Sequence, residues 1–159
     1  MRHLPLVFLS ILVLTAGCTN NIEVEKALLL DQVHTGWYDA GIVDGKNKLV
    51  PSIALKLKNV SGEPVAGVQL NAVFRRVNEP EAWGDHYVRA IGPEGLGPTA
   101  STGDFVLRSN LGYTGTQPRT QMLQNREFVD AKVEIYAKHG SRTWVKLGDY
   151  KIDRQLLTE

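Results

Sequence analysis

The side chains that could bind a metal ion or act as general bases are three histidines, His34, His86 and His139. No two of them have the two- or four-residue spacing that places ligands on one side of a strand or helix. Asp85 precedes His86 directly, and adjacent residues of a strand point to opposite faces. A structural zinc site needs four ligands that often include thiolates, and the chain has one cysteine, Cys18. The sequence therefore predicts no metal site and no cofactor.

Residues suited to covalent or acid–base catalysis are present, but they form no recognisable motif. The Gly-x-Ser-x-Gly motif of hydrolases is absent, and Ser109 and Ser141 lie in segments with the composition of turns. Glu79 and Glu81 could pair for glycoside hydrolysis, but their polar, proline-containing stretch is typical of a solvent-exposed loop. The glycine-rich stretch 92–103 lacks the Gly-Lys-Ser/Thr ending of a phosphate-binding loop. We therefore expect a long loop at 92–103 and a protein that is not an enzyme.

Aromatic and basic side chains offer another kind of site, one that binds a partner. Trp37, Tyr38 and Trp83 stand next to predicted turns, where exposed rings could form a binding surface. The alternative is that these rings cover the open ends of a β-sandwich. Arg75 and Arg76 end a predicted strand, where they either point into solvent or bind an anionic partner. These five residues are the candidate partner-binding residues.

An uncharged and largely apolar run covers residues 4–15, between the positive charge of Arg2 and the cysteine at position 18. A run of about a dozen residues has the length of the apolar region of a secretory signal peptide, and it is too short to span a bilayer. The residues LTAGC at 14–18 resemble the lipobox of bacterial lipoproteins, with threonine where leucine is more common. An ordinary signal peptide that ends near a cysteine is the alternative.

The resemblance to bacterial lipoproteins implies both processing and location. Residues 1–17 would be removed as a signal peptide, Cys18 would be lipidated, and residues 18–26 would tether a domain at 27–159. The lipid on Cys18 would attach the protein to a membrane of the bacterial cell envelope, facing the periplasm or the exterior. By the sorting habit of the family, Thr19 after the cysteine favours the outer membrane.

Charge and cysteine content narrow the possible partners. The chain has 18 lysine and arginine residues against 17 aspartate and glutamate residues, and one of the 18, Arg2, lies in the segment expected to be removed. This balance argues against a nucleic-acid partner and against a polybasic membrane-binding surface. With Cys18 lipidated no thiol remains for a disulfide, and a domain of this length can bury a sufficient core without one.

Alternation of apolar and polar residues predicts a hairpin in the first half of the chain. Residues 52–58 alternate isoleucine or leucine with polar or small residues, which indicates a strand with one solvated face. Residues 59–64 have the composition of a turn. The alternation resumes over residues 65–75, and two such strands across a turn predict a β-hairpin.

The rest of the chain predicts further strands and almost no helix. These strands are expected at 27–38, 87–91, 105–107, 129–138 and 143–147, with one helical turn at 121–123. Gly36 and Gly41 should interrupt the chain in this region, and Asp44-Gly45 is expected to form a turn. About seven strands with turns at intervals near ten residues predict an all-β, antiparallel sandwich. Trp144 is expected in or over the core of this sandwich.

The predicted hairpin carries a second resemblance. Its sequence, LKLKNVSGEPVAGVQLNAVFRR at 55–76, resembles the central hairpin of small immunoglobulin-like domains of secreted and lipid-anchored bacterial proteins, including the FxLYD-type group. The FxLYD signature is absent, because Phe74 is followed by two arginines. The resemblance implies an immunoglobulin-like β-sandwich and no catalytic residues.

Two functions follow from these expectations. The first is a lipid-anchored, non-enzymatic interaction or accessory module that binds a protein partner in an envelope complex, through sheet edges and the loops around Trp37, Trp83 and 92–103. The alternative is a periplasmic small-ligand carrier or sensor, in which 92–103 closes over a pocket between the sheets. A carrier needs a pocket of several hundred Å³, whereas a docking module needs an exposed apolar surface or an unpaired edge strand.

Overall fold

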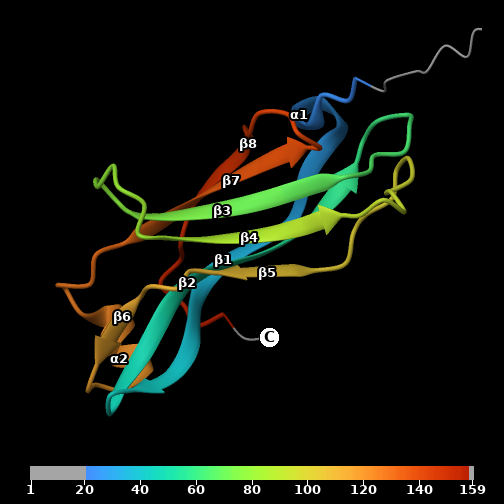
Figure 1. Cartoon of the computed structure of the whole chain (residues 1–159). Helices are drawn as coiled ribbons and strands as arrows, with labels where there is room; N and C mark the ends of the chain where they lie inside the picture. The colour runs from blue at the N-terminus through green and yellow to red at the C-terminus, as the bar shows by residue number, and fades with distance from the viewer. Residues whose placement is uncertain (1–20, 158–159) are drawn as a thin grey trace, which may run out of the picture.

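The computed structural model describes residues 21–157, which form two antiparallel β-sheets packed face to face (Figure 1). The elements in chain order are α1 (Val24–Ala27), β1 (Leu28–Val43), β2 (Lys46–Asn59), β3 (Val68–Arg76), β4 (Gly84–Ile91), β5 (Phe105–Arg108), β6 (Tyr113–Gly115), α2 (Arg119–Gln124), β7 (Ala131–His139) and β8 (Val145–Lys151). The predicted all-β sandwich is confirmed. It has eight strands rather than about seven, because the short β6 lies in a segment whose glycines and proline gave no strand signal.

The strand order is that of an immunoglobulin-like sandwich with one strand moved. One sheet has the order β1-β2-β5, with β6 also pairing with β2, and the other has the order β4-β3-β7-β8. In an immunoglobulin constant domain, strands A, B, E and D face strands C, F and G. Here β1, β2 and β5 take the places of A, B and E, and β3, β7 and β8 those of C, F and G. The fourth strand pairs with β3 instead of joining the first sheet.

The hairpin predicted across 59–64 is wrong, because β2 and β3 belong to different sheets. Their predicted apolar faces are buried, but they meet across the core instead of lying side by side. The buried amide of Asn59 fixes the connection between the sheets, since its Nδ2 donates to the carbonyl oxygens of Glu63 and Leu96 at 2.8 and 2.9 Å. Alternation identifies the buried face of a strand but not its neighbour.

β1 and β2 form a long hairpin that extends beyond one end of the sandwich (Figure 1). β1 continues through Gly36 and Gly41, where interruptions were expected. Irregular register after Asp31 and after Asp39 absorbs the extra residues, as β-bulges do. The turn at residues 44–45 was predicted, and both residues have positive φ, +51° and +74°, as two-residue hairpin turns require.

The core lies between the inner faces of the two sheets. Its largest fully buried side chains are Trp37, Phe74, Leu49, Ile53, Leu55, Leu57, Leu70, Leu107, Ile135 and Ile152. Trp144 is not among them and is 39% exposed, which corrects the prediction made for it. Val145 faces the core opposite Ala137, so the residue before it points outward.

The two ends of the sandwich differ in what they carry. α1 lies beside the turn between β7 and β8, whereas β6, α2 and the tip of the β1–β2 hairpin lie at the opposite end (Figure 1). Residues 1–20, with the predicted signal peptide and Cys18, lie outside the described residues. Within residues 21–157 no helix is long and apolar enough to cross a bilayer.

Candidate binding surfaces

Trp37 lies in the core and not on a binding surface. Its indole is fully buried, and its ring centroid lies 4.6 Å from that of Phe128 and 5.6 Å from that of Tyr113. Because β1 runs on through Gly36, Trp37 stands in mid-strand and not beside a turn. The interpretation of Trp37 as an exposed partner-binding residue is therefore wrong.

Trp83 and Arg76 close the end of the core that contains Trp37. The half-buried ring of Trp83 lies 6.2 Å from that of Trp37 and 4.9 Å from that of Tyr113. The guanidinium of Arg76 stacks on Trp83 at 4.8 Å, a cation–π contact. Burial raises the pKa of the Tyr113 hydroxyl, which donates to the carbonyl of Val129 at 2.9 Å. Trp83 thus covers an open end of the sandwich, in line with the alternative interpretation of these rings.

Tyr38 points away from this aromatic cluster. It neighbours Trp37 in the strand, so its ring stands on the outer face of β1. The guanidinium of Arg108 lies 3.5 Å from the centre of the Tyr38 ring and covers it. The structure therefore does not bring Tyr38 together with Trp83 or Arg76.

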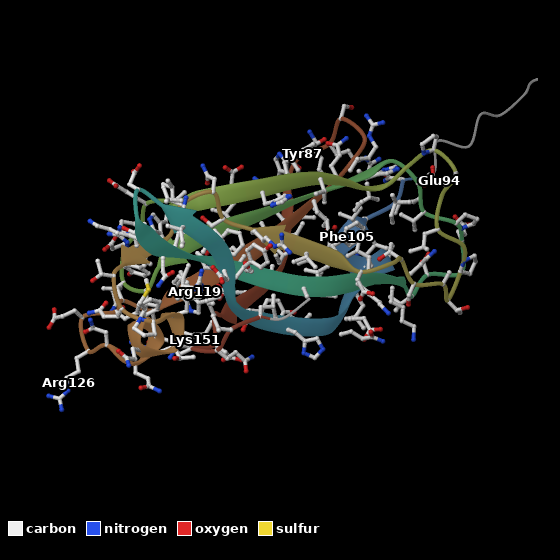
Figure 2. All side chains as sticks on the ribbon, turned by 90° about the horizontal axis from the view of Figure 1, so that it is seen from below. Tyr87, Glu94, Phe105, Arg119, Arg126 and Lys151 are labelled. Atoms are coloured by element: carbon white, nitrogen blue, oxygen red, sulfur yellow. The ribbon has the colours of Figure 1, made fainter. Side chains whose placement is uncertain are left out.

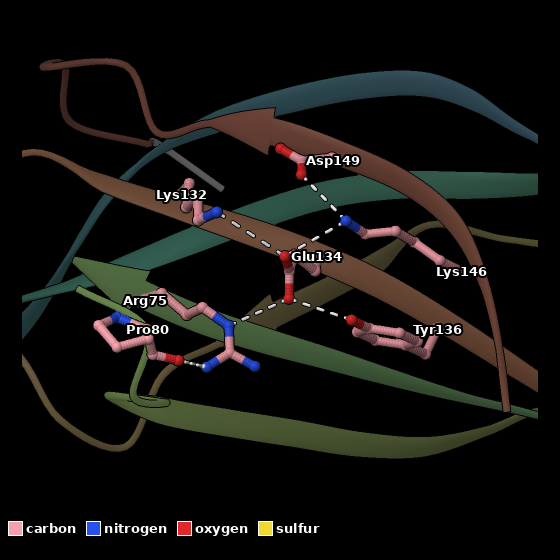
Figure 3. Close-up of polar contacts among 7 residues, drawn as sticks. All are labelled: Arg75, Pro80, Lys132, Glu134, Tyr136, Lys146 and Asp149. Atoms are coloured by element: carbon pink, nitrogen blue, oxygen red, sulfur yellow. Dashed lines mark hydrogen bonds and ion pairs between the residues drawn. The ribbon is translucent and has the colours of Figure 1, made fainter. Parts of the chain in front are cut away.

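Arg75 belongs to an ionic network centred on Glu134 (Figure 3). Glu134 points outward from β7 but is only 8% exposed. Its carboxylate accepts hydrogen bonds from Arg75 Nε at 3.1 Å, the Tyr136 hydroxyl at 3.1 Å and Lys146 Nζ at 3.2 Å. Lys132 Nζ lies 3.8 Å away. Arg75 is thus already paired within the sheet, which leaves little support for its role toward an anionic partner.

Hydrogen bonds to the Glu134 carboxylate together affect its pKa more than its burial does. Burial acts to raise the pKa of the carboxyl, but hydrogen bonds from Arg75, Lys146 and Tyr136 lower the pKa from 4.5 to about 2. Glu134 is therefore ionised at neutral pH. Its hydrogen bonds link side chains of β3, β7 and β8 and so stabilise this sheet.

The outer face of the same sheet exposes two aromatic rings that the sequence did not single out as a site. Tyr87 on β4, which Figure 2 places at the margin of the molecule, is 53% exposed, and Trp144 before β8 is 39% exposed. Their ring centroids lie 6.3 Å apart at 82°, and Lys138 Nζ lies 4.9 Å from the Trp144 ring. The inward-facing neighbours Val88 and Val145 are the sequence signal that could have identified both as outward.

Cross-strand register shows that charge is unevenly spread over this outer face. The row nearest α1 consists of Arg89, Gln69 and Lys138, and the next row consists of Tyr87, Asn71, Tyr136 and Lys146. These two rows contain cations, amides and rings, whereas the carboxylates of Asp85, Glu134 and Asp149 lie in the third row. We call the charged and aromatic part of this half the α1-side face: Tyr87, Arg89, Tyr136, Lys138, Trp144 and Lys146.

The tip of the β1–β2 hairpin exposes apolar side chains at the opposite end. Ile42 is 70% exposed and Val43 is 40% exposed, although both are β-branched residues of a strand. Asn47 Nδ2 donates to the carbonyl of Gln117 at 2.9 Å and holds the tip against the segment before α2. We call Ile42 and Val43 the hairpin tip.

Two hollows open at the surface of the molecule. One of about 380 Å³ lies between α1 and the turn at residues 61–63, and one of about 260 Å³ lies under the 92–103 loop. The second falls below the 300–1,000 Å³ of common ligand pockets, which weakens the carrier interpretation. Within residues 21–157 no group of three or more histidine, cysteine, aspartate or glutamate side chains is placed to hold a metal ion.

Comparison with known proteins adds little to this description. No family model matches the chain, and no curated protein matches it. A solved structure, Northeast Structural Genomics Consortium target SoR45, aligns over 81% of this chain and 88% of its own, at 10% identity and a TM-score of 0.44.

Proposed function

We propose that this protein is a lipid-anchored, non-enzymatic interaction module of the bacterial cell envelope, which docks a protein partner on the hairpin tip. The observation that carries the proposal is the exposure of Ile42 and Val43 at the end of β1, in the hairpin that extends beyond the sandwich (Figure 1). The exposure of large apolar side chains to water is unfavourable, and a partner that covers them gains the free energy of burying them.

The position of the hairpin tip suits a protein held at Cys18. The described chain begins at Asn21, near α1, and the tip lies at the far end of the molecule (Figure 1). A lipid on Cys18 would keep α1 close to the membrane and leave the tip at the end farthest from the anchor. The apolar tip would then be presented to partners in the space that the membrane borders.

The hairpin tip is also firmly supported. β6 pairs with β2 at residues 47–49, and Arg119 of α2 forms an ion pair with Asp39 of β1. Hydrogen bonding from Arg119 lowers the pKa of the Asp39 carboxyl, so the pair stays charged at neutral pH. A hairpin held in this way loses little conformational entropy when it binds.

Site-specific crosslinking in cells tests this proposal. A photoreactive amino acid replaces Ile42 in one variant and Val106 in a control, because Val106 is also exposed but lies on β5. We expect one envelope protein to crosslink at position 42 and not at position 106. Val43→Asp should lower the yield about tenfold, the effect of about 1.4 kcal/mol at an interface. The same products at both positions, or none at 42, would contradict the proposal.

A further inference from the structure

We infer that the α1-side face rests on the anionic lipid headgroups of the membrane that holds the protein. The inference rests on the proposed lipid anchor at Cys18 and concerns a surface other than the hairpin tip. It assigns a ligand class, phospholipid headgroups of negative charge, to a sheet face.

The α1-side face lies close to the proposed lipid anchor. Cys18 and Asn21 are three residues apart, and a chain of that length spans at most about 11 Å. Arg142, in the β7–β8 turn, donates a hydrogen bond to the Asn21 side chain and contacts the Ile22 carbonyl at 3.5 Å. Trp144 follows two residues later. A lipid on Cys18 would therefore hold this turn close to the headgroups.

The exposed aromatic residues suit this environment. Tryptophan and tyrosine rings combine an apolar body with a polar tip, and both are enriched where proteins meet the membrane–water interface. Tyr87 and Trp144 are large exposed side chains, and the two rows nearest α1 otherwise hold cations, amides and Tyr136. Their T-shaped contact at 6.3 Å presents them to the membrane as one unit.

The charges of the α1-side face complement an anionic surface. Among the described residues, Arg89 and Lys138 form no ion pair, whereas Lys146 is bound to Glu134 and Asp149. Each unpaired cation close to such a surface gives about a fivefold preference for the bound state. The nearly balanced total charge of the chain argued against a basic membrane surface. It does not show the local excess of positive charge on the α1-side face.

Acidic side chains also lie at this end of the molecule, but outside the cross-strand rows of the α1-side face: Glu23 and Glu25 at α1, Glu63 beside it, and Glu94 in the 92–103 loop (Figure 2). Figure 2 shows Glu94 and Arg126 at opposite ends of the long axis. Glu94 turns back on its own loop, where its carboxylate accepts a hydrogen bond from the Gly92 N–H at 3.2 Å. It stands outside the cross-strand rows that make up the α1-side face.

Fluorescence quenching in vesicles tests the inference. The purified lipidated protein is reconstituted into phosphatidylcholine vesicles with or without phosphatidylglycerol, and a nitroxide-labelled lipid acts as the quencher. We expect tryptophan emission to be quenched when phosphatidylglycerol is present and the quenching to disappear in Trp144→Phe. Trp37 is buried and Trp83 is half-buried beside it, so their emission should change little.

Two matched double variants separate the role of the face from that of total charge. Arg89→Ala with Lys138→Ala removes an arginine and a lysine from the α1-side face, and should lower the membrane-apposed population roughly 30-fold. Lys46→Ala with Arg126→Ala removes the same residue types from exposed positions, the first at the start of β2 and the second after α2. This control pair should leave the quenching unchanged.

The outcomes distinguish the anchor from the face. Protein that floats with the vesicles but shows no Trp144 quenching would overturn this inference and leave the anchor intact. Protein that does not float would overturn the anchor and this inference with it. Quenching that is equal without phosphatidylglycerol would overturn the role of the cations. A Trp144 emission that responds only to an added envelope protein would assign the face to a protein instead.

Discussion

Glu134 is an acidic residue that points outward from a strand and is nevertheless covered by its neighbours. Three side chains from β3, β7 and β8 donate hydrogen bonds to its carboxylate. A carboxylate in this position is stabilising only while it is ionised, because its loss would leave several cations crowded without a counter-charge. The side chains around Glu134 thus link three strands that are already joined by their backbone ladders.

The stability of the protein should depend on the charge of Glu134 in acid. Its pKa is about 2 in the folded protein and near 4.5 when unfolded, so its contribution is complete above pH 4.5 and is lost as pH falls to 2. We expect Glu134→Gln to lower the free energy of unfolding by about 2 kcal/mol at pH 7. The difference between variant and wild type should shrink towards pH 2. Urea unfolding across this range measures it.

Asp149→Asn is the control for Glu134→Gln. Asp149 also pairs with Lys146, at 3.1 Å, but its side chain is half exposed. We expect a change of less than about 1 kcal/mol at pH 7, as is usual for exposed pairs. Equal effects of the two substitutions, or a Glu134→Gln effect that does not vary with pH, would contradict the role given to Glu134.

Among the elements, the connection from β2 to β3 decides which strands become neighbours. Asn59, at the end of β2, is fully buried and donates to the carbonyls of Glu63 and Leu96, while its oxygen accepts from the Ser61 N–H at 2.9 Å. One amide thereby joins the turn after β2 to the 92–103 loop. β2 and β3 form their backbone ladders with other strands, β1 and β5 for the first and β4 and β7 for the second.

Asn59→Ala should therefore loosen two loops together. We expect the free energy of unfolding to fall by about 2–3 kcal/mol, because several buried carbonyl groups lose their donor. Hydrogen exchange of residues 60–67 and 92–103 should become faster. Asn47→Ala, which removes a single exposed hydrogen bond, should change both quantities little. Faster exchange in only one of the two loops would show that Asn59 does not join them.

The elements also show what the sequence could predict. Strict alternation on β2, β3 and β7 identified the strands and their buried faces, because period-two burial is a local property. Pairing is not local, so the chain crossed between sheets where a hairpin was expected. Among the candidate binding residues, Trp37 was misplaced because Gly36 did not end its strand. The exposure of Tyr87 and Trp144 depends on which face of the sheet each position points to. The size of the ring alone does not indicate that face.

At the scale of the whole molecule, the two ends of the sandwich receive different roles. Close to the anchor, the α1-side face would rest on the membrane, and at the other end of the molecule the hairpin tip would bind a partner. Both roles need the chain to be held at Cys18, since an unattached domain has no preferred end. Lipidation of Cys18 is therefore the central claim.

Intact-mass spectrometry of the protein purified from the membrane fraction tests that claim most directly. We predict a chain that lacks residues 1–17 and carries acyl chains on Cys18, and a Cys18→Ala variant that is missing from the membrane fraction. A chain that begins at another residue, or that keeps Cys18 as a free thiol, would contradict the account.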